Sequence, residues 1–564
     1  MQIIDIPDRP WVNFHQSQPD FNQKILGLAD FIEQHASERQ KKAAAEYLGA
    51  TISYAELNFL ANKLANALRD RGVQRSETIG LHLPNTPEYL IALVAASKLG
   101  CPVTGVSPLL TTPEIEHQLQ DAGARFLISM EQVYTTSVAP ADGRLSLLRG
   151  VFVTSPIGIL PKWKQHAAYF SGKLPRPSWK PMIHTATEAF MPAVQNASDA
   201  HAYASVAEDE TVFIQYTGGT TGKPKGAELT KRNMFANGLQ AMSFIGGDSG
   251  DTFASAFPLF HQAGLAISLM ALRAGARQLL IPNPRDIDFF ITQMKKFPPT
   301  MLGNVPSLYQ MLLEKPAFRE IDFSRLRVAF SGAAPFAPEG IRQLEVVVGA
   351  GKLCEVYGMT ETSPLITINP PGRTKPGTVG IPLPGSDVKI MDAETGNVEM
   401  PAGEVGEITT CGPNVMKGYR GHSEATAQSV REINGKRWMY TGDIGFFDAE
   451  GYLTICDRAK DMLIVGGYKV FSVEVESKLK ELPCIELCAL VGLPDPNRPG
   501  NDIVKLYVQL SADSSSVNRD VLMVQILDFC RQNMAPYKVP KHIEFMATLP
   551  LTPIGKLDKK ALRN

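Results

Sequence analysis

Apolar residues near the start of the chain recur with the period of an α-helix. In SYAELNFLANKLANALRDRG (53–72) a leucine returns every three or four residues, which places the leucines on one helical face. Ser53 provides an N-cap hydroxyl, Glu56 stands three residues later as in a capping box, and Gly72 follows the last apolar position. The pattern predicts an amphipathic helix that ends near Gly72.

Short apolar runs alternate with helical segments up to about residue 332. Two further helices are expected to begin at Thr86-Pro87-Glu88 and at Thr112-Pro113-Glu114, where proline stands in the first turn. Strands that alternate with helices indicate parallel, doubly wound sheets, so a large α/β N-terminal domain with flanking helices is predicted. The expected strands are TIGLHLP (78–84), RFLIS (125–129), VFIQYT (212–217), RQLLIP (277–282) and LRVAFSG (326–332).

The pattern changes near residue 457. DMLIVGGYKVFS (461–472) predicts a strand pair around Gly466 and Gly467, and a helix is expected to begin at Ser472. Two apolar strands, a helix from Asn518 and a last strand complete a unit of α+β type. We therefore predict a large domain over residues 1–459 and a small, mobile C-terminal domain over residues 460–564.

Composition narrows the functional classes. The chain has 564 residues, of which 44% are hydrophobic and 20% charged, which is typical of folded domains rather than of disorder. The 56 basic and 57 acidic residues nearly cancel, so a nucleic acid partner is not expected. The N-terminus carries Asp5 and Asp8 where a signal peptide would be basic, which favours a cytoplasmic location. The seven scattered cysteines indicate neither a disulfide framework nor a zinc site.

One region has a strong charge bias. Residues 143–187 contain no Asp or Glu but include seven Lys and Arg residues, and Trp163 and Trp179 lie among them. One interpretation is a solvated surface segment whose aromatic side chains pack against the rest of the domain. The other is a patch that rests on the inner face of an anionic membrane, with the tryptophans at headgroup depth. The sequence also leaves a homodimer open.

The strongest chemical signal is YTGGTTGKPKGAELT (216–230), directly after a predicted strand. Its glycines let backbone N–H groups approach phosphate oxygens, and its lysines offset their charge. The loop departs from the Walker pattern, because Thr217 replaces the first glycine and Pro224 replaces the Ser or Thr that would hold magnesium. The candidate phosphate-binding residues are Thr217, Gly218, Gly219, Thr220, Thr221, Gly222, Lys223 and Lys225.

This loop resembles the signature of the adenylate-forming enzymes, which comprise acyl-CoA synthetases, peptide-synthetase adenylation domains and beetle luciferases. The pattern is most like that of a bacterial fatty acyl-CoA ligase. The resemblance covers roughly Tyr216 to Lys556, whereas the first two hundred residues match only in general layout. The other segments that carry it, in the expected order, are SGAAP (331–335), YGMTET (357–362), TGD (441–443), DRAKD (457–461), GGYKVFSVEVE (466–476) and PLTPIGK (550–556).

The resemblance implies a reaction in two steps with ATP, Mg²⁺ and CoA. A carboxylate attacks the α-phosphate of ATP, pyrophosphate leaves, and a thiol then takes the acyl group from the acyl-adenylate. It assigns the β- and γ-phosphates to the loop, the α-phosphate to Thr360, and a Mg²⁺ ligand to Glu361. Lys556 would stabilise the adenylation transition state.

The remaining roles implied by the resemblance concern the nucleoside, the hinge and the thiol. Asp443 would accept hydrogen bonds from the ribose, Arg458 would reach the ribose or a phosphate, and Lys460 would be the hinge of the small domain. The adenine would be bound by Gly332, Ala333, Ala334, Pro335, Tyr357, Gly358 and Met359. The CoA channel would be lined by Gly466, Gly467 and Tyr468.

The acid substrate is expected to be hydrophobic. FPLFHQAGLAISLMALRAGA (257–276) and GNVPSLYQMLL (303–313) provide two apolar walls, with His261, Gly303 and Val305 as candidate pocket residues. A medium- or long-chain fatty acid is favoured. The alternatives are an aryl- or branched-acid CoA ligase, an acyl-AMP ligase that loads a carrier protein, and a non-catalytic relative that kept the fold. His261 is either a gate at the pocket mouth or a hydrogen-bonded core histidine.

Overall fold

The computed structural model describes most of the chain. The described residues are 9–15, 19–170, 178–201, 203–217, 223–393, 395–466, 468–496, 498, 501–514, 517–551 and 557–563. They fall into two compact units, one formed by Met1–Asp387 with Thr410–Met439 and the other by Val388–Thr409 with Tyr440–Asn564. The boundary predicted between residues 459 and 460 remains a prediction.

The first unit contains an eight-stranded sheet. Strands β8, β4, β3, β5, β6 and β7 run parallel, whereas β9 and β19 extend the sheet in antiparallel pairing. Its order is β19 (Gly418–Tyr419), β9 (Lys225–Thr230), β8 (Thr211–Thr217), β4 (Val103–Gly105), β3 (Thr78–His82), β5 (Ala124–Met130), β6 (Gly150–Thr154) and β7 (Ala186–Ala189).

A nine-stranded sheet completes the strand framework of this unit. Its centre, from β14 to β1, is parallel, and both ends are antiparallel. Its order is β16 (Ile381–Pro382), β15 (Leu365–Ile368), β14 (Leu353–Gly358), β13 (Val328–Ser331), β12 (Met301–Asn304), β10 (Thr252–Ser255), β11 (Arg277–Leu280), β1 (Ala43–Tyr47) and β2 (Ala50–Ser53). The predicted parallel strands are therefore divided between two sheets.

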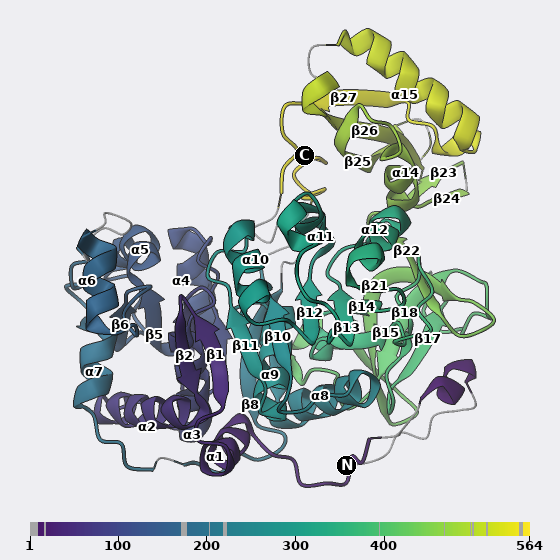
Figure 1. The fold of residues 1–564 in the computed structure, drawn as a ribbon. Coiled ribbons are helices and arrows are strands. Elements are labelled where there is room, and N and C mark those ends of the chain that lie inside the picture. The colour runs from purple at the N-terminus through teal and green to yellow at the C-terminus, as the bar shows by residue number, and fades with distance from the viewer. Residues whose placement is uncertain are drawn as a thin grey trace. The chain divides into compact units, whose positions relative to one another are not determined.

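Helices cover these sheets. The capping box predicted for α2 is present, because Ser53 Oγ accepts from Glu56 N and the Glu56 carboxylate accepts from Ser53 N. Figure 1 shows α8 and α9 crossing in front of the strands, and α9 packs on β10 and β11. The main helices are α1 (Leu28–Glu38), α2 (Tyr54–Asp70), α3 (Pro87–Leu99), α4 (Thr112–Asp121), α6 (Lys162–Phe170), α7 (Phe190–Asn196), α8 (Lys231–Ile245), α9 (Gln262–Ala274), α10 (Ile287–Lys296), α11 (Pro306–Leu313), α12 (Pro338–Val348) and α13 (Ser423–Ser429).

The second unit contains the predicted α+β region. The strand pair around Gly466 is confirmed, since Val465 pairs with Tyr468, and the helix expected from Ser472 begins there. A separate three-stranded sheet packs its apolar face on α14 and α15. The sheet consists of β25, β26 and β27. The helices and strands of this region are β22 (Leu453–Arg458), β23 (Leu463–Val465), β24 (Tyr468–Val470), α14 (Ser472–Leu479), β25 (Ile485–Pro494), β26 (Asp502–Leu510), α15 (Arg519–Asn533) and β27 (His542–Met546).

Three strands contain residues of both units. They are β17 (Asp387–Met391), β18 (Gly406–Cys411) and β21 (Lys436–Phe447). β20 (Val430–Ile433) pairs with the first residues of β21 within the first unit, and the later residues of β21 pair with β22 within the second. Among the described residues, no helix is long and apolar enough to cross a bilayer.

Candidate active site

The predicted phosphate loop joins two paired strands. β8 and β9 form an antiparallel hairpin in which Thr217 lies opposite Lys225. Tyr216 Oη donates a 2.5 Å hydrogen bond to Asp121 Oδ2, which fixes the end of β8. Gly218, Gly219, Thr220, Thr221 and Gly222 lie outside the described residues. The strands thus place Thr217 and Lys225 side by side at the base of the loop.

Tyr419 connects this hairpin to the predicted Mg²⁺ ligand. β19, which contains Tyr419, pairs with β9 next to the loop. The Lys225 ammonium lies over the Tyr419 ring, 4.9 Å from its centroid, and Tyr419 Oη donates a 2.7 Å hydrogen bond to Glu361 Oε1. Burial and the Glu361 carboxylate both raise the pKa of Tyr419, so its hydroxyl remains a donor. Sequence reasoning identified Lys225 and Glu361 but missed Tyr419.

The backbone around Glu361 is held by the same segment of chain. Thr360–Thr362 forms a short 3-10 turn, and Glu361 is 5% exposed. Met416 N donates to Glu361 O at 2.8 Å, and Asn414 Nδ2 donates to Thr362 O at 3.1 Å. These bonds hold the backbone of the turn that carries Thr360 and Glu361, and the Tyr419 hydroxyl holds the Glu361 carboxylate. Asn414 is a second residue that sequence reasoning missed.

The other predicted residues of the first unit gather at one edge of the nine-stranded sheet. β12, β13 and β14 are parallel neighbours, so their carboxyl ends meet at the same edge. Gly358 ends β14 where a side chain could not fit, because a Cβ would lie 1.9 Å from Pro364 O. The residues brought together there are Gly303 in β12 and Val305 after it, Gly332, Ala333, Ala334 and Pro335 after β13, and Tyr357 and Gly358 at the end of β14 with Met359 after it.

The predicted ribose and hinge residues belong to the second unit. Asp443 and Arg458 lie opposite each other on β21 and β22, and Arg458 Nε is 3.2 Å from Asp443 Oδ1. Lys460 lies two residues after the end of β22. Tyr468 is 59% exposed and stacks on Tyr537 with ring centroids 4.5 Å apart.

Two predicted residues of this unit cannot be placed. Gly467 and Lys556 lie outside the described residues. Gly466, which precedes Gly467, has a φ of 60° and donates its N–H to Asn501 Oδ1. The structure therefore describes the turn up to Gly466 and the chain on both sides of Lys556, at Leu551 and Leu557.

His261 begins helix α9. Its Nδ1 accepts a 3.3 Å hydrogen bond from Ala263 N, so the ring acts as an N-cap. This contact assigns Nδ1 as the acceptor nitrogen of the imidazole. The gate role proposed for His261 remains a prediction.

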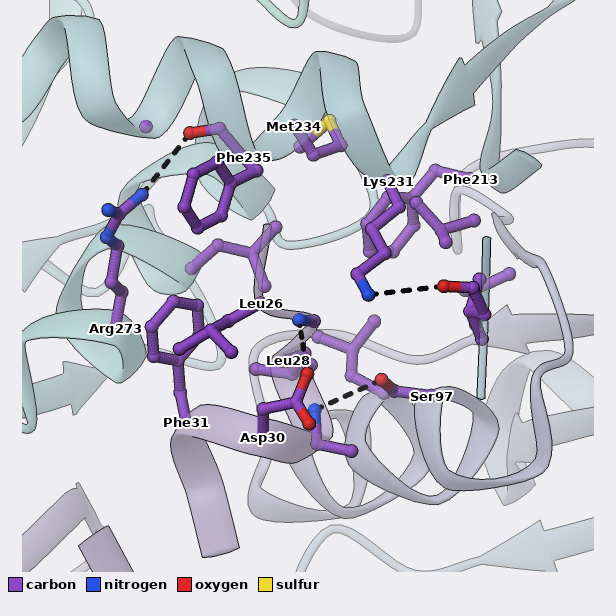
Figure 2. A pocket seen from close by; sticks show the side chains of 18 of the residues that line it. Leu26, Leu28, Asp30, Phe31, Ser97, Phe213, Lys231, Met234, Phe235 and Arg273 are labelled. Atoms are coloured by element: carbon purple, nitrogen blue, oxygen red, sulfur yellow. Dashed lines mark hydrogen bonds between the residues drawn. The ribbon is translucent and has the colours of Figure 1, made fainter. Parts of the chain in front are cut away.

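An apolar cavity of about 110 Å³ lies between α8, α9 and the segment that enters α1 (Figure 2). Its walls include Leu26, Phe31, Phe213, Phe235 and Leu269. It is also lined by Ser363 and Leu365, which come shortly after the turn that carries Glu361. The cavity therefore reaches from the N-terminal segment to the edge of the predicted reaction site.

Arg273 lies at another part of this cavity wall. Its guanidinium lies 5.4 Å from the Phe31 ring and 4.5 Å from the Phe235 ring, and Nη1 donates to Phe235 O (Figure 2). Burial lowers the pKa of Arg273 to about 10, so the side chain stays charged at neutral pH. The predicted acyl wall on α9 lines this cavity, but the predicted pocket residues His261, Gly303 and Val305 do not. The cavity could not be predicted from the sequence, because Leu26 to Phe31 come from a segment far away in the chain.

The donor set suits a hard cation that is shared with a nucleotide. Within the described part of the chain, no group of three His, Cys, Asp or Glu side chains could hold a metal by itself. Glu361 offers carboxylate oxygens next to Tyr419, which contacts Lys225 at the base of the predicted phosphate loop. Mg²⁺ is commonly bound through one or two carboxylates together with substrate phosphates. The residues present therefore fit a Mg²⁺ ion that arrives with ATP.

Curated relatives match nearly the whole chain. A long-chain-fatty-acid–CoA ligase of Escherichia coli O6:H1 is 31% identical over 551 residues, covering 96% of this chain and 95% of that protein. A feruloyl-CoA synthase of Amycolatopsis is also 31% identical and covers 95% of this chain and 98% of that protein.

Solved structures show the same fold. The anthranilate CoA ligase AuaEII in complex with anthranoyl-AMP has a TM-score of 0.81 and 26% identity, with 96% of this chain and 97% of that chain covered. ATP-bound MatB from Rhodopseudomonas palustris has a TM-score of 0.79 and 28% identity, with 95% and 98% covered. Residues 32–420 match the AMP-binding enzyme family, and residues 474–556 match the AMP-binding enzyme C-terminal domain. The chain belongs to the AMP-binding enzyme family.

Proposed function

We propose that this chain is an AMP-forming acyl-CoA ligase whose acid substrate is a medium- or long-chain fatty acid. The acid oxygen attacks the α-phosphorus of ATP and pyrophosphate leaves, which gives an acyl-adenylate. The thiol of CoA then attacks the acyl carbon and AMP leaves. The observation that carries the proposal is the Lys225–Tyr419–Glu361 contact, since it joins the phosphate hairpin to the motif that would hold the α-phosphate.

The residues of the first unit have separate parts in this proposal. Lys225 and the loop it ends would bind the β- and γ-phosphates, and Thr360 would contact the α-phosphate. Glu361 would give one oxygen ligand to Mg²⁺, which absorbs the negative charge that develops during phosphoryl transfer. Tyr419 orients that carboxylate through its hydroxyl. Gly332 to Pro335 and Tyr357 would bind the adenine at the edge of the sheet.

The second unit would provide the remaining groups. Asp443 would accept hydrogen bonds from the ribose, and its contact with Arg458 would place the guanidinium near the nucleotide. Lys556 would stabilise the adenylation transition state. Lys460 would act as the hinge, and the turn at Gly466 to Tyr468 would line the path of CoA.

The apolar cavity supports a fatty acid as the substrate. Its walls offer hydrocarbon contacts along α8 and α9, and they include Ser363 and Leu365, close in sequence to Glu361. Each methylene buried there should contribute about 0.8 kcal/mol, so catalytic efficiency should rise with chain length. The names of the fatty-acid ligase relatives agree with this substrate class.

Filling the cavity tests the substrate. Gly238 on α8 lines it, and a Cβ at that position would contact only the Arg273 guanidinium, at 3.6 Å. Gly238→Leu should lower kcat/KM for dodecanoate about tenfold or more and leave butyrate nearly unchanged. Thr292→Leu places the same side chain at an exposed position of α10 and should change neither value. Equal losses for both acids would contradict the assignment of the acyl chain to this cavity.

An aryl acid is the second candidate substrate. The feruloyl-CoA synthase and the anthranilate ligase among the relatives favour it. A panel of butyrate, dodecanoate, benzoate and ferulate, assayed for AMP release with and without CoA, separates the candidates. A higher kcat/KM for ferulate or benzoate than for dodecanoate would identify an aryl acid, rather than a fatty acid, as the substrate. AMP release that never yields a CoA thioester would instead favour an acyl-AMP ligase that loads a carrier protein.

A further inference from the structure

The C-terminal segment Leu557–Arg563 is fastened to the second unit on both sides of the predicted catalytic loop. Leu551 and Leu557 form an antiparallel bridge, and Asp558 N donates a 2.9 Å hydrogen bond to Pro550 O. Leu562 is 4% exposed, and its carbonyl accepts a 2.9 Å hydrogen bond from Tyr507 Oη. The chain is thus fixed at Leu551 and again from Leu557, and Lys556 directly precedes Leu557 in the sequence.

Lys559 makes two short polar contacts with α14. Its ammonium lies 2.7 Å from Glu476 Oε1 and donates a 2.5 Å hydrogen bond to Ser472 Oγ. The Lys559 and Glu476 side chains are only 12% and 11% exposed. Ser472 and Glu476 are four residues apart on α14, so one helical face receives the ammonium. A buried, charge-assisted contact of this kind holds a side chain far more firmly than an exposed ion pair does.

The acceptors of Lys559 are themselves fixed. Glu476 Oε1 also accepts a 2.7 Å hydrogen bond from Leu490 N of β25. Ser472 N donates to Asp457 Oδ2, and Asp457 is 2% exposed. The ammonium therefore offsets two buried carboxylates, and neither can turn to another cation without leaving a backbone donor unpaired.

We propose that Lys559 is a positioning residue for adenylation, which fixes the segment after Lys556 on α14 through Glu476 and Ser472. This inference rests on the proposed function, in which Lys556 stabilises the transition state. Arg563 adds a second attachment, because its guanidinium lies 2.6 Å from Asp461 Oδ1, next to the predicted hinge residue Lys460. Lys559 and Arg563 thus attach the segment Leu557–Arg563 to α14 and to Asp461.

Substitutions at Lys559 separate positioning from folding. Lys559→Met keeps the length of the side chain but removes the charge, and Lys559→Met with Glu476→Gln avoids an unpaired buried carboxylate. Both variants should lose about tenfold or more in the kcat of acid-dependent ATP–pyrophosphate exchange. The KM for ATP, and thioester formation from supplied acyl-AMP, should stay within about twofold of the wild type. Lys559→Arg should recover most of the exchange rate.

A double variant shows whether Lys559 acts through Lys556. In a Lys556→Ala background, adding Lys559→Met should cause no further loss of exchange, because the residue being positioned is gone. Lys478→Met is the matched control, since Lys478 pairs with Glu481 on the exposed surface of the same unit. A further loss in the Lys556→Ala background, or equal loss in both half-reactions, would overturn the positioning role.

Hydrogen exchange tests the attachment without any enzyme assay. Lys559→Met with Glu476→Gln should speed amide exchange in residues 547–563 and leave α15 as protected as in the wild type. Unchanged exchange in that segment would overturn the attachment. The proposed function is tested separately. If the wild-type protein shows the expected protection of its amide hydrogens but catalyses no ATP–pyrophosphate exchange with any acid, the proposed function is contradicted and the positioning role with it.

Discussion

The Tyr419 hydroxyl orients the carboxylate assigned to Mg²⁺, so its removal should weaken use of Mg-ATP. Tyr419→Phe deletes a hydrogen bond to a charged acceptor, which contributes about 1.5–3 kcal/mol. We expect kcat/KM for ATP to fall about ten- to hundredfold, with a higher Mg²⁺ requirement in steady-state kinetics. Tyr134→Phe, which removes a hydroxyl bonded to Lys180 O, is the control. An unchanged Mg²⁺ dependence would show that Tyr419 does not support Glu361.

Glu355 lies on β14, close in sequence to the predicted site, and should make the stability of the folded protein depend on pH. It is 8% exposed on β14, and burial raises its pKa to about 7, although backbone N–H groups of Gly377 and Phe336 oppose the shift. The unfolded chain releases this proton near pH 4.5 while the folded protein keeps it to about pH 7. The contribution of Glu355 to stability therefore falls as pH rises from 4.5 to 7 and stays low above pH 7.

Glu355→Gln should remove this dependence. Relative to the wild type, the variant should become more stable as pH rises from 5 to 8, by up to about 3 kcal/mol. Urea denaturation at the two pH values measures the difference. The same stability difference at pH 5 and pH 8 would mean that Glu355 is charged in the folded protein throughout this range.

Single site residues could be predicted where they belong to a short sequence motif that indicates their chemical role. Glu361 and Lys225 could be identified from short sequence patterns, and the structure brings them to one tyrosine. Tyr419 and Asn414 could not, because their importance arises only when β19 pairs with β9 and the preceding segment bonds to the turn at Glu361. Their own neighbours in the sequence contain no signal for this contact.

Helix α6 is the element that would contact a membrane. It lies in the acid-free region 143–187, with Trp163 68% exposed and Phe170 97% exposed. Each lysine near an anionic surface should contribute about 1 kcal/mol at low salt. Lys162→Gln with Lys164→Gln should therefore weaken cosedimentation with anionic vesicles about tenfold without changing AMP release from a soluble acid.

A charge-matched pair provides the control for α6. Lys480 and Lys541 are exposed in the second unit, and Lys480→Gln with Lys541→Gln should leave vesicle binding unchanged. Equal vesicle binding by the wild type and the α6 variant would favour the alternative, in which residues 143–187 form a solvated surface with no lipid partner.

Elements were predictable from local signals, but their pairing was not. The capping box of α2 and the turn at Gly466 follow from residues within a few positions of each other. The division of the parallel strands between two sheets, and the antiparallel ends of both, depend on contacts between distant segments. The apolar cavity has the same origin, since Leu26 to Phe31 meet α8 and α9 only in the folded chain.

The two half-reactions place different demands on the whole molecule. Adenylation builds negative charge on the α-phosphate, so Lys556→Ala should cost about 3 kcal/mol or more, at least about a hundredfold in acyl-AMP formation. Conversion of supplied acyl-AMP and CoA to acyl-CoA should stay near normal, because the thiol step does not need this ammonium. Rapid-quench assays of each half-reaction measure both. Equal damage to the two steps would assign Lys556 a structural part.

The order of motifs along the chain predicted the family, and the matches over residues 32–420 and 474–556 confirm it. The acid is harder to predict, because relatives of equal identity carry names for fatty and aryl acids. Chain-wide similarity therefore defines the reaction type better than the substrate.

Product analysis of one complete reaction tests the central claim most directly. Purified protein is incubated with dodecanoate, ATP, Mg²⁺ and CoA, and all products are quantified by chromatography and mass spectrometry. An AMP-forming acyl-CoA ligase must yield AMP, pyrophosphate and dodecanoyl-CoA in equal amounts, with no AMP when the acid is omitted. Formation of ADP and phosphate, or failure to form any acyl-CoA from dodecanoate, would contradict the account.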